Sequence, residues 1–364
     1  MCLRVSSKTV GIIGGGQLGM MLAEAVKKLG GKVIALDPSV DASVTHVCDE
    51  FINASFDDLE ALEELGKKSD VITYEFENVK SEYLNNLARK YNIKQGLAPL
   101  FDSQDRLREK ENALKHGLLP VRFFAVSSKE DLLKGVKELG YPCLYKTRTL
   151  GYDGHGQVLI KKPSDLEKVT PYLKGSGILE EYLNFDYEVS VIMVRNQNKC
   201  VALPLNRNMH KNGILDITYL PSGVSKELEE RIIKASKIFM ESANYLGILC
   251  IEYFVKGDKF YFNEMAPRPH NSGHYSIEGC NYSQYDLFAR FLLDLDLPEI
   301  SLKTSIVMKN ILGESLYMVD KLKELPNAHV HMYYKKEARP KRKMGHITFT
   351  DMTYDEYKKI EENM

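Results

Sequence analysis

The sequence predicts an α/β and α+β protein, in which an N-terminal doubly wound parallel sheet is followed by a two-lobed domain and a small mixed C-terminal lobe. Two observations lead to this prediction. Over residues 10–92, short apolar runs alternate with helical segments, which is typical of parallel strands joined by helical crossovers. From Leu179 onward the apolar runs lengthen and alternate with polar residues, which favours antiparallel pairing.

The N-terminal region is expected to form the parallel sheet. Its strands are Val10–Ile13, Lys32–Leu36 and Asp70–Tyr74, and its helices are Gln17–Leu29, Leu59–Gly66 and Ser81–Tyr91. Gly14-x-Gly16-x-x-Gly19 follows the first strand, and Asp37 follows the second. This is the form of a dinucleotide-binding fingerprint, so a nicotinamide or flavin oxidoreductase is one hypothesis for the function.

A domain boundary is expected at Lys94–Ser103, where Gly and Pro interrupt the periodicity. The elements expected after it are a charged helix within 103–117, a strand at Val121–Ala125, a helix entered through a capping box of Ser128 and Asp131, the strand "CLYKT" (143–147), the strand "VLIKK" (158–162), and the longer strands "YEVSVIMV" (187–194), "CVALPL" (200–205), "GILCIEYFV" (247–255) and "KFYFNEMA" (259–266).

Composition and charge exclude several classes of protein. A chain of 364 residues is too long for one ordinary core. Lys and Arg number 49 against 50 Asp and Glu, which argues against a nucleic-acid partner. No apolar run approaches the roughly 18 residues of a membrane span, and no signal peptide opens the chain. The six cysteines show no ligand-like spacing, so we expect a reduced, cytoplasmic protein.

A glycine-rich segment follows the strand that carries Lys146. Gly151, Gly154 and Gly156 fall within "GYDGHGQ" (151–157), and such a loop can fold its backbone N–H groups over phosphates. Lys146 would meet the phosphates as a point charge. The segment is not a Walker A loop, because here the lysine precedes the glycines.

Carboxylates interrupt two apolar strands farther along the chain. Glu252 lies on one strand and Asn263-Glu264 on the next, and a hairpin centred on Gly257-Asp258 would bring positions 252 and 264 together. Paired carboxylates are ligands that Mg²⁺ prefers. The loop "PRPHNSGH" (267–274) follows directly and places Arg268 and His270 beside this predicted metal site.

The order of these features resembles the ATP-grasp superfamily. Within it, "GGGQLG", "GYDGHGQ", "APRPHNSGHYSIEG" and "KKEARPKRKMGH" closely resemble the family of N5-carboxyaminoimidazole ribonucleotide synthetases, the ATPase-subunit type of phosphoribosylaminoimidazole carboxylase. The resemblance runs from about residue 10 to 352. It implies a pre-ATP-grasp domain over 1–96, an ATP-grasp small lobe with a glycine-rich lid over 97–178, a large lobe with the metal site over 179–297, and a C-terminal lobe over 298–364.

The resemblance implies an ATP-dependent carbon–nitrogen ligase of de novo purine biosynthesis. Its substrates would be ATP, bicarbonate and 5-aminoimidazole ribonucleotide, and its products the N5-carboxylated ribonucleotide, ADP and phosphate, formed through carboxyphosphate. Mg²⁺, or Mn²⁺ in its place, would be the cofactor, with neither biotin nor NAD. A cytoplasmic homodimer without a nucleic-acid or membrane partner is expected.

The family's functional residues map onto matching positions of this chain. Expected to contact ATP are Arg106, Lys146, Gly151, Tyr152, Asp153, Gly154, His155, Gly156, Gln157, Glu180, Glu181, Tyr182, Leu183, Glu188, His210, Asn263 and Glu264, with Glu180–Leu183 at adenine and Glu188 at ribose. Glu252 and Glu264 would bind the metal, and Arg268, His270, Lys146 and Asp153 would be catalytic. Expected to bind the ribonucleotide are Gln17, Glu75, Tyr152, Asp153, Arg268, His270, Lys336 and Arg342.

Alternatives remain at this point. Lys341 stands where the family often has Gly, so it is open which residue of the basic run Lys335–Lys343 holds the substrate phosphate. A non-catalytic nucleotide-binding protein and a formate-using glycinamide ribonucleotide transformylase are further hypotheses, whereas biotin carboxylase would need a much longer chain. We interpret the glycine fingerprint as a decoy for NAD, with Gln17 and Glu75 forming a wall of the ribonucleotide site.

Overall fold

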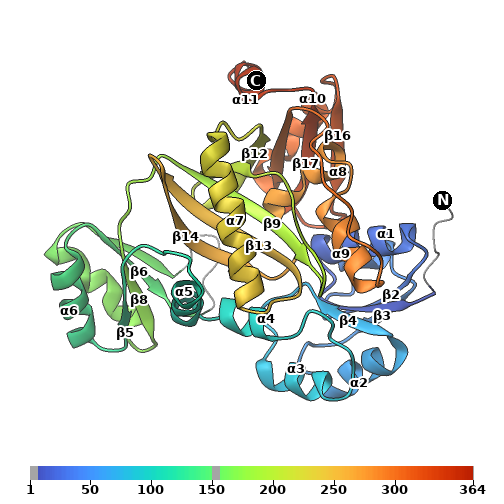
Figure 1. Ribbon diagram of the computed structural model, residues 1–364, viewed down its shortest axis with the longest axis horizontal. Helices are drawn as coiled ribbons and strands as arrows, with labels where there is room; N and C mark the ends of the chain where they lie inside the picture. The colour runs from blue at the N-terminus through green and yellow to red at the C-terminus, as the bar shows by residue number, and fades with distance from the viewer. Residues whose placement is uncertain (1–6, 150–155, 364) are drawn as a thin grey trace.

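The computed structural model describes residues 7–149 and 156–363 (Figure 1). Its N-terminal domain is a parallel sheet with the strand order β3-β2-β1-β4, as the alternation of strands and helices predicted. The elements are β1 (Thr9–Ile13), α1 (Gln17–Lys28), β2 (Lys32–Asp37), β3 (Glu50–Asn53), α2 (Leu59–Lys68), β4 (Val71–Tyr74) and α3 (Ser81–Ala88). Sequence reasoning missed β3, which is short and forms the edge of the sheet.

The small lobe is an antiparallel sheet with the order β5-β8-β6-β7. Its elements are β5 (Phe123–Val126), α6 (Lys129–Leu139), β6 (Cys143–Thr147), β7 (Gln157–Ile160) and β8 (Gly177–Glu181). Ser128 caps α6 as predicted, because its side chain accepts a hydrogen bond of 3.0 Å from the backbone of Asp131. Two helices, α4 (Ala98–Ser103) and α5 (Arg106–Lys115), connect this lobe to the N-terminal domain.

The large lobe and the C-terminal lobe share one antiparallel sheet. Its strands follow the order β14-β13-β9-β11-β12-β15-β17-β16, and β10 pairs with β9. The strands are β9 (Tyr187–Arg195), β10 (Cys200–Ala202), β11 (Asn206–Lys211), β12 (Ile214–Leu220), β13 (Gly247–Lys256), β14 (Lys259–Ala266), β15 (Ile306–Leu312), β16 (Ala328–Met332) and β17 (Lys343–Thr350). The helices are α7 (Lys226–Ser242), α8 (Ser276–Gly279), α9 (Gln284–Leu292), α10 (Val319–Leu322) and α11 (Tyr354–Glu361).

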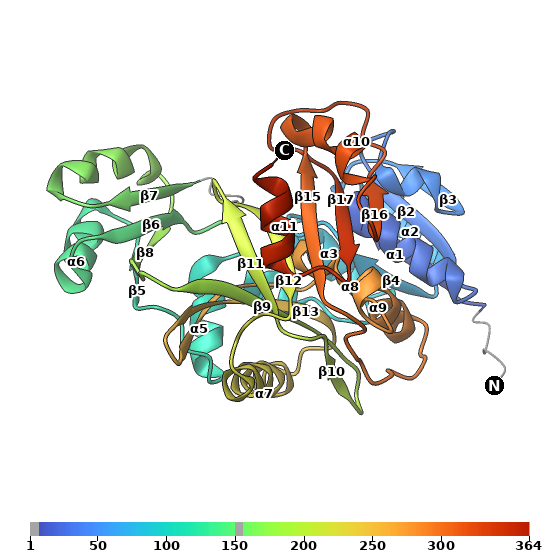
Figure 2. The same cartoon turned by 90° about the horizontal axis from the view of Figure 1, so that it is seen from above.

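One core joins the N-terminal domain to the large sheet. Leu22 and Val26 of α1 pack in the same buried cluster as Phe288 and Leu292 of α9, and Figure 2 shows these two helices side by side. The small lobe has a separate core around Val136 of α6. The N-terminal domain and the large sheet therefore share one core, and a site between them would have a fixed geometry. Among the described helices, none is long and apolar enough to cross a membrane.

Candidate functional site

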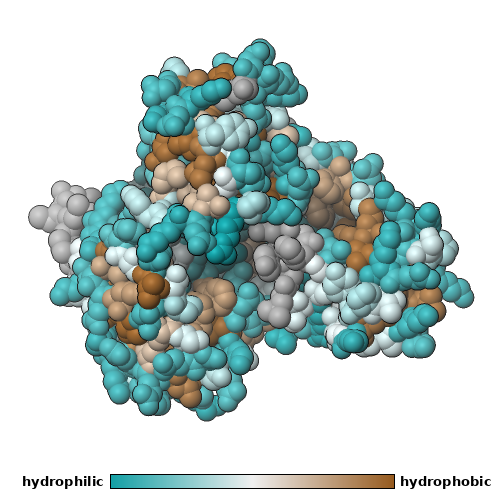
Figure 3. Space-filling view, turned by 180° about the vertical axis from the view of Figure 1, so that it is seen from behind, coloured by the Kyte–Doolittle hydropathy of each residue, from teal (hydrophilic) through white to brown (hydrophobic). Residues whose placement is uncertain are grey.

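A cavity of about 600 Å³ lies where the domains meet. In the view from behind, much of the surface around the junction of the lobes is hydrophilic (Figure 3). Many of the residues predicted from the sequence line this cavity: Gln17, Glu75, Arg106, Lys146, Gln157, Glu188, His210, Glu252, Asn263, Glu264, Arg268 and His270. These residues come from three of the four expected domains, so the fold brings together the residues that the resemblance assigned to ATP, the metal and the ribonucleotide.

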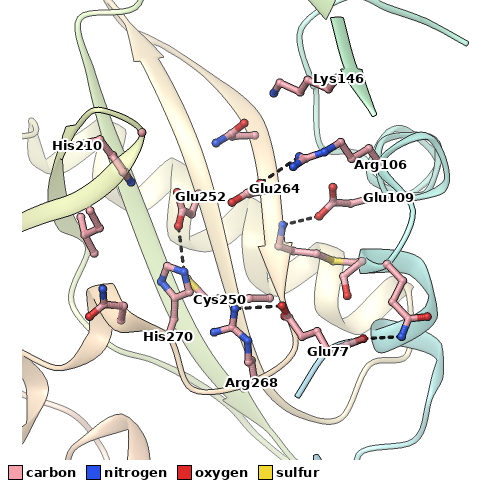
Figure 4. Close-up of a pocket in the computed structure, with 18 of the residues that line it drawn as sticks. Glu77, Arg106, Glu109, Lys146, His210, Cys250, Glu252, Glu264, Arg268 and His270 are labelled. Atoms are coloured by element: carbon pink, nitrogen blue, oxygen red, sulfur yellow. Dashed lines mark hydrogen bonds and ion pairs between the residues drawn. The ribbon is translucent and has the colours of Figure 1, made fainter. Parts of the chain in front are cut away.

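The two carboxylates of the hairpin face each other across strands β13 and β14. Glu252 pairs in register with Glu264, and the turn falls at Gly257-Asp258, as the sequence predicted. On its other side Glu252 pairs with Ser190 of β9. The antiparallel register therefore sets both carboxylates in one row at the cavity (Figure 4).

The surroundings of Glu252 suit a divalent cation. Burial and the neighbouring Glu264 carboxylate raise the pKa of Glu252, because two like charges are held close together without water. Ligand atoms of Glu188, His210 and Glu252 all lie within 4.8 Å of one another. Carboxylate oxygens that repel each other around a small space are the donors that Mg²⁺ prefers, so the carboxylates of Glu188 and Glu252 fit the predicted metal.

His210 carries positive charge into this acidic cluster. Burial acts to lower its pKa, but the hydrogen bond to Glu188 and the charges of Glu252 and Glu264 outweigh burial and raise the pKa to about 9. The Nδ1 atom of His210 lies 3.3 Å from a carboxylate oxygen of Glu188. His210 is therefore cationic at neutral pH and offsets part of the negative charge of the ligand-free site.

Two cations face the carboxylates from the opposite side of the cavity. Arg106 at the start of α5 lies 3.3 Å from Glu264. Lys146 of β6 lies 2.7 Å from Glu180, which Lys110 also contacts at 3.0 Å. Burial acts to raise the pKa of Glu180, but the two lysines outweigh it and hold the pKa at about 2. Arg106 and Lys146 are thus fixed near each other, as a phosphate-binding pair requires.

The predicted adenine segment lies at the end of β8. The Glu180 carboxylate is buried between the two lysines, so an adenine contact from this residue would have to use its backbone. Glu181 pairs with Arg122 at 2.8 Å, and Tyr182 is exposed. Glu180–Leu183 are not among the described residues that line the cavity, and their contact with adenine stays a prediction.

Sequence reasoning missed an apolar wall near this segment. Leu144, Phe185 and Phe254 line the cavity, and the rings of Phe185 and Phe254 stack with centroids 4.5 Å apart. Such a wall suits the face of a nucleotide base. Phe185 lies between two polar residues and Phe254 lies within an apolar run, so neither gives a motif and only the fold could reveal this surface.

Most of the predicted lid lies outside the described residues. This applies to Gly151, Tyr152, Asp153, Gly154 and His155. Gly156 has φ +73°, and a Cβ there would lie 2.4 Å from the Thr147 hydroxyl, so the end of the loop requires glycine. Gln157 then begins β7 and lines the cavity.

Arg268 and His270 lie on the loop after β14, as predicted. The Arg268 guanidinium donates hydrogen bonds of 3.1 Å each to the Glu77 carboxylate and to the backbone carbonyl of Pro269. The Nε2 atom of His270 lies 3.1 Å from Glu252. Burial, followed by the charge of Arg268, lowers the pKa of His270 well below its usual range, so this imidazole is neutral at pH 7.

Glu109 is a buried cavity residue that sequence reasoning missed. Its carboxyl group accepts a hydrogen bond of 2.6 Å from the backbone of Met265, beside Glu264. Burial and then the Glu264 charge raise the pKa of Glu109 to about 8. One face of α5 carries Arg106, Glu109 and Lys110, because residues three and four positions apart lie on the same side of a helix. This spacing could have identified the three residues together from the sequence.

The basic run near the C-terminus divides between surface and cavity. Lys336 is 72% exposed and lies 2.5 Å from Asp41, so the structure does not bring it into the cavity. Lys335 is half-buried and donates a hydrogen bond of 2.8 Å to the Lys343 carbonyl. Burial and the charge of Arg342 lower the pKa of Lys335 to about 8, and the charge of Glu75 offsets part of this lowering. Arg342 donates to the Glu337 carbonyl at 2.9 Å. Neither Lys336 nor Arg342, the two residues chosen from the sequence, is among the described residues that line the cavity. Lys335 is partly buried and interacts with the charges of Arg342 and Glu75.

The glycine fingerprint is occupied by the protein's own carboxylates. Gly14 has φ +105°, and a Cβ there would lie 2.6 Å from the Glu75 carboxylate. The backbone of Gly16 hydrogen-bonds Glu75, whose pKa is raised to about 7 chiefly by burial and lowered in part by Arg268. The backbone of Gly15 donates to Asp37 at 2.7 Å. Glu75 thus fills the anion position at the start of α1.

Comparisons with known proteins match each part of the chain. A ribonucleotide synthetase preATP-grasp domain model matches residues 7–99, an ATP-grasp domain model matches 111–285, and a phosphoribosylaminoimidazole carboxylase C-terminal domain model matches 306–360. These models leave the exact domain limits predicted from the sequence as predictions.

Individual relatives are similar over nearly their whole length. An N5-carboxyaminoimidazole ribonucleotide synthase of Staphylococcus haemolyticus is 44% identical over 96% of this chain and 95% of its own. The structure of N5-carboxyaminoimidazole synthetase from Staphylococcus aureus with ADP has a TM-score of 0.93 and 41% identity, covering 100% of this chain and 98% of that one. The Aspergillus clavatus N5-carboxyaminoimidazole synthase with ADP and 5-aminoimidazole ribonucleotide has a TM-score of 0.90 and 29% identity, covering 99% and 98%.

Proposed function

The chain belongs to the N5-carboxyaminoimidazole ribonucleotide synthase family, and from this membership and the cavity geometry we propose how its residues perform the family's reaction. It is an ATP-grasp ligase that carboxylates 5-aminoimidazole ribonucleotide at the expense of ATP in purine biosynthesis. The observation that carries the assignment of roles is the cavity, where the carboxylate row, the cations Arg106 and Lys146, and the pair Arg268 and His270 meet.

The chemistry explains why these groups are needed together. Bicarbonate is a poor electrophile, so one of its oxygens first attacks the γ-phosphorus of ATP, and ADP leaves. The resulting carboxyphosphate is a mixed anhydride, whose carboxyl group passes to the exocyclic amine while phosphate leaves. Arg106 and Lys146 lie where they can bind the phosphates of ATP and neutralise the negative charge that accumulates in the transition state.

Glu252 and Glu264 are proposed to hold Mg²⁺ or Mn²⁺, with Asn263 beside them. When bound, the cation supplies further neutralisation of the transferred phosphoryl group. Glu188 and His210 lie within reach of the same position and are proposed to orient the ribose of ATP. We also propose that the glycine-rich loop excludes water from the intermediate, that the chain works as a homodimer, and that it is cytoplasmic.

The ribonucleotide is proposed to bind at the edge of the N-terminal sheet. Gln17 and Glu75 line this side of the cavity. Arg268, on the loop after β14, connects that loop to the N-terminal domain through its hydrogen bond to Glu77. Lys335, which faces Glu75 and Arg342, is proposed to hold the substrate phosphate together with Arg342. Lys336 is directed to the surface, which argues against the role first predicted for it.

Lys335→Met is expected to raise the KM for the ribonucleotide by about tenfold, because a charge-assisted hydrogen bond to phosphate contributes roughly 1.5–3 kcal/mol. Steady-state phosphate release with varied ribonucleotide would measure this. The neighbouring Lys336→Met removes the same charge from an exposed position and serves as the matched control, with a KM change of less than about twofold. A larger effect at Lys336 than at Lys335 would reverse the assignment.

NADH and NADPH are expected not to bind, because the Glu75 carboxylate occupies the position that a pyrophosphate would need. Calorimetry with each dinucleotide, ATP and the ribonucleotide measures this directly. Micromolar binding of either dinucleotide would contradict the interpretation of the glycine fingerprint as a decoy.

One assay separates the proposed function from its nearest rival. Phosphate release from ATP is expected only when bicarbonate and 5-aminoimidazole ribonucleotide are both present. Release that instead requires formate and glycinamide ribonucleotide would identify a transformylase and reject the proposed carboxylation.

A further inference from the structure

A chain of buried polar side chains extends from His270 into the middle of the large sheet. Its members are Ser272, Ser190, Asn206, Asn208 and Thr218, and each is at most 4% exposed. None of them is assigned a role in the proposed function. Buried polar groups far from water are retained only when they are hydrogen-bonded, and an apolar sheet interior would not need them.

The sheet register sets these side chains side by side. Ser190 of β9 pairs with Asn206 of β11 on one side and with Glu252 of β13 on the other. Asn208 of β11 pairs with Thr218 of β12. The polar side chains therefore extend the cross-strand row of Glu264 and Glu252 into the interior of the sheet.

The amide of Asn208 has a fixed orientation. Its Oδ1 atom accepts hydrogen bonds of 2.9 Å from the Thr218 hydroxyl and 2.8 Å from the amide of Asn206. Its amide nitrogen is consequently the donor toward Ser190, at 3.0 Å. With the Asn206 amide oriented as it is, a flipped Asn208 amide would place its nitrogen 2.8 Å from the Asn206 amide nitrogen, and two N–H groups cannot hydrogen-bond each other.

The Ser190 hydroxyl has two acceptors within reach of its proton, the oxygen of Ser272 and the carbonyl oxygen of Asn206. Its oxygen accepts hydrogen bonds from the amide nitrogens of Asn206 at 2.9 Å and Asn208 at 3.0 Å, and these use both lone pairs. The hydroxyl lies 2.7 Å from the oxygen of Ser272, closer than the 3.2 Å to the Asn206 carbonyl oxygen. Ser190 therefore donates to Ser272.

Ser272 in turn donates its hydroxyl proton to the imidazole of His270. Having accepted from Ser190, its hydroxyl is 2.8 Å from Nδ1 of His270, and its backbone N–H also points to Nδ1 at 3.3 Å. With two donors directed at it, Nδ1 is the acceptor, and the ring proton lies on Nε2. That atom is 3.1 Å from Glu252. Gln284 holds the backbone on both sides, with hydrogen bonds of 2.8 Å to the N–H and 2.8 Å to the carbonyl of His270.

We propose that Ser272 and Ser190 are positioning residues that hold His270 as its Nε2–H tautomer, so that His270 donates a hydrogen bond into the cavity. In the ligand-free chain the acceptor is the Glu252 carboxylate. For the acceptor during the reaction, an anionic oxygen of bicarbonate or of the departing phosphate, this inference rests on the proposed function. An imidazole whose ring proton lies on Nε2 presents no lone pair at that atom. His270 therefore stabilises negative charge at the reacting centre and does not remove the amine proton at that nitrogen.

The tautomer can be measured in the ligand-free chain. Nitrogen-15 NMR of protein labelled in its histidine rings distinguishes a protonated from an unprotonated nitrogen, and the His270→Asn chain identifies the His270 signals among the nine histidines. We expect an unprotonated Nδ1 and a protonated Nε2. A protonated Nδ1 in the wild-type chain would overturn the proposal without any use of a Ser variant.

Kinetics of the two Ser variants test the consequence. Ser272→Ala and Ser190→Ala are each expected to lower kcat by about tenfold, equivalent to about 1.4 kcal/mol, with the KM for ATP unchanged within about twofold. Ser236→Ala is the matched control, because that buried hydroxyl bonds to Tyr253 at 2.7 Å on the far side of the sheet. In the Ser272→Ala chain the Nε2–H signal should weaken or move.

The outcomes separate this inference from the proposed function. An equal loss in the Ser236→Ala chain, or a wild-type kcat in both positioning variants, would overturn the positioning role. If wild-type protein releases no phosphate with bicarbonate and the ribonucleotide, the proposed function fails, while the NMR measurement still decides the tautomer. Recovery of kcat in the Ser272→Thr chain, which restores the hydroxyl, would support the assignment.

Discussion

Turnover is expected to fall by about a thousandfold or more when Glu264 is replaced with Gln. The substitution keeps the size of the side chain and removes the charge that faces Glu252 across the hairpin. Loss of a carboxylate from a divalent site removes several kcal/mol of transition-state stabilisation, and every 1.4 kcal/mol changes the rate tenfold. Phosphate release at saturating substrates, repeated over a range of Mg²⁺ concentrations, measures the effect.

The Glu264→Gln chain should nevertheless fold. It loses one half of an ion pair with Arg106, but it also relieves the repulsion that raises the pKa of Glu252. We therefore expect the free energy of unfolding to change by about 1 kcal/mol or less. Glu230→Gln, which removes a carboxylate that is 69% exposed on α7, is the control with normal turnover. Near-normal activity of the Glu264→Gln chain would reject Glu264 as a metal ligand.

The hairpin of β13 and β14, which carries Glu252 and Glu264, could be predicted from the sequence because its contacts are local. A turn at Gly257-Asp258 between two apolar runs fixes the register, and the register fixes which residues face each other. Local periodicity likewise explains why β1, β2, β4 and the helices of the N-terminal domain were predicted nearly within their observed bounds, although β3 was missed. Local pattern and tertiary structure agree in these segments.

The continuity of the large sheet could not be predicted in the same way. β12 ends at Leu220 and pairs with β15, which begins at Ile306, so this contact joins strands far apart in the sequence. No feature of the sequence of either strand identifies the strand with which it pairs. The C-terminal segment was consequently expected as a separate mixed lobe, although its strands extend the sheet of the large lobe.

The direction of a single side chain also depends on the fold. Lys335 and Lys336 are neighbours of the same type, and the backbone between β16 and β17 decides which one is partly buried and which one is exposed. Tyr334 adopts a positive φ of 55°, which no residue pattern indicates and which turns the chain before the two lysines. Glu180 is a similar case, because an acidic residue at a strand end is usually solvated but here is buried between two lysines.

Arg268→Ala is expected to lower carboxylated product formation by about a hundredfold or more, while the affinity for ADP stays within about twofold. The guanidinium spans two parts of the site, since it donates to Glu77 of the N-terminal domain and faces Glu75 beneath the expected ribonucleotide. Its removal takes away a fixed positive charge where carboxyphosphate would form and leaves the Glu77 carboxylate without that partner. Removing one preorganised donor of this kind typically slows catalysis by about 10²–10³.

The control for Arg268 is Arg290→Ala, because that guanidinium donates to the Asp296 carbonyl at 2.6 Å on α9, outside the described lining of the cavity. Product and phosphate should be measured together, since ATP can be cleaved without transfer of the carboxyl group. Arg268→Ala is expected to lower the ratio of product to phosphate, because the cations that we propose contact ATP, Arg106 and Lys146, remain in place. If ADP affinity falls and the ratio is unchanged, Arg268 belongs to the nucleotide site and the reacting centre must lie elsewhere in the cavity.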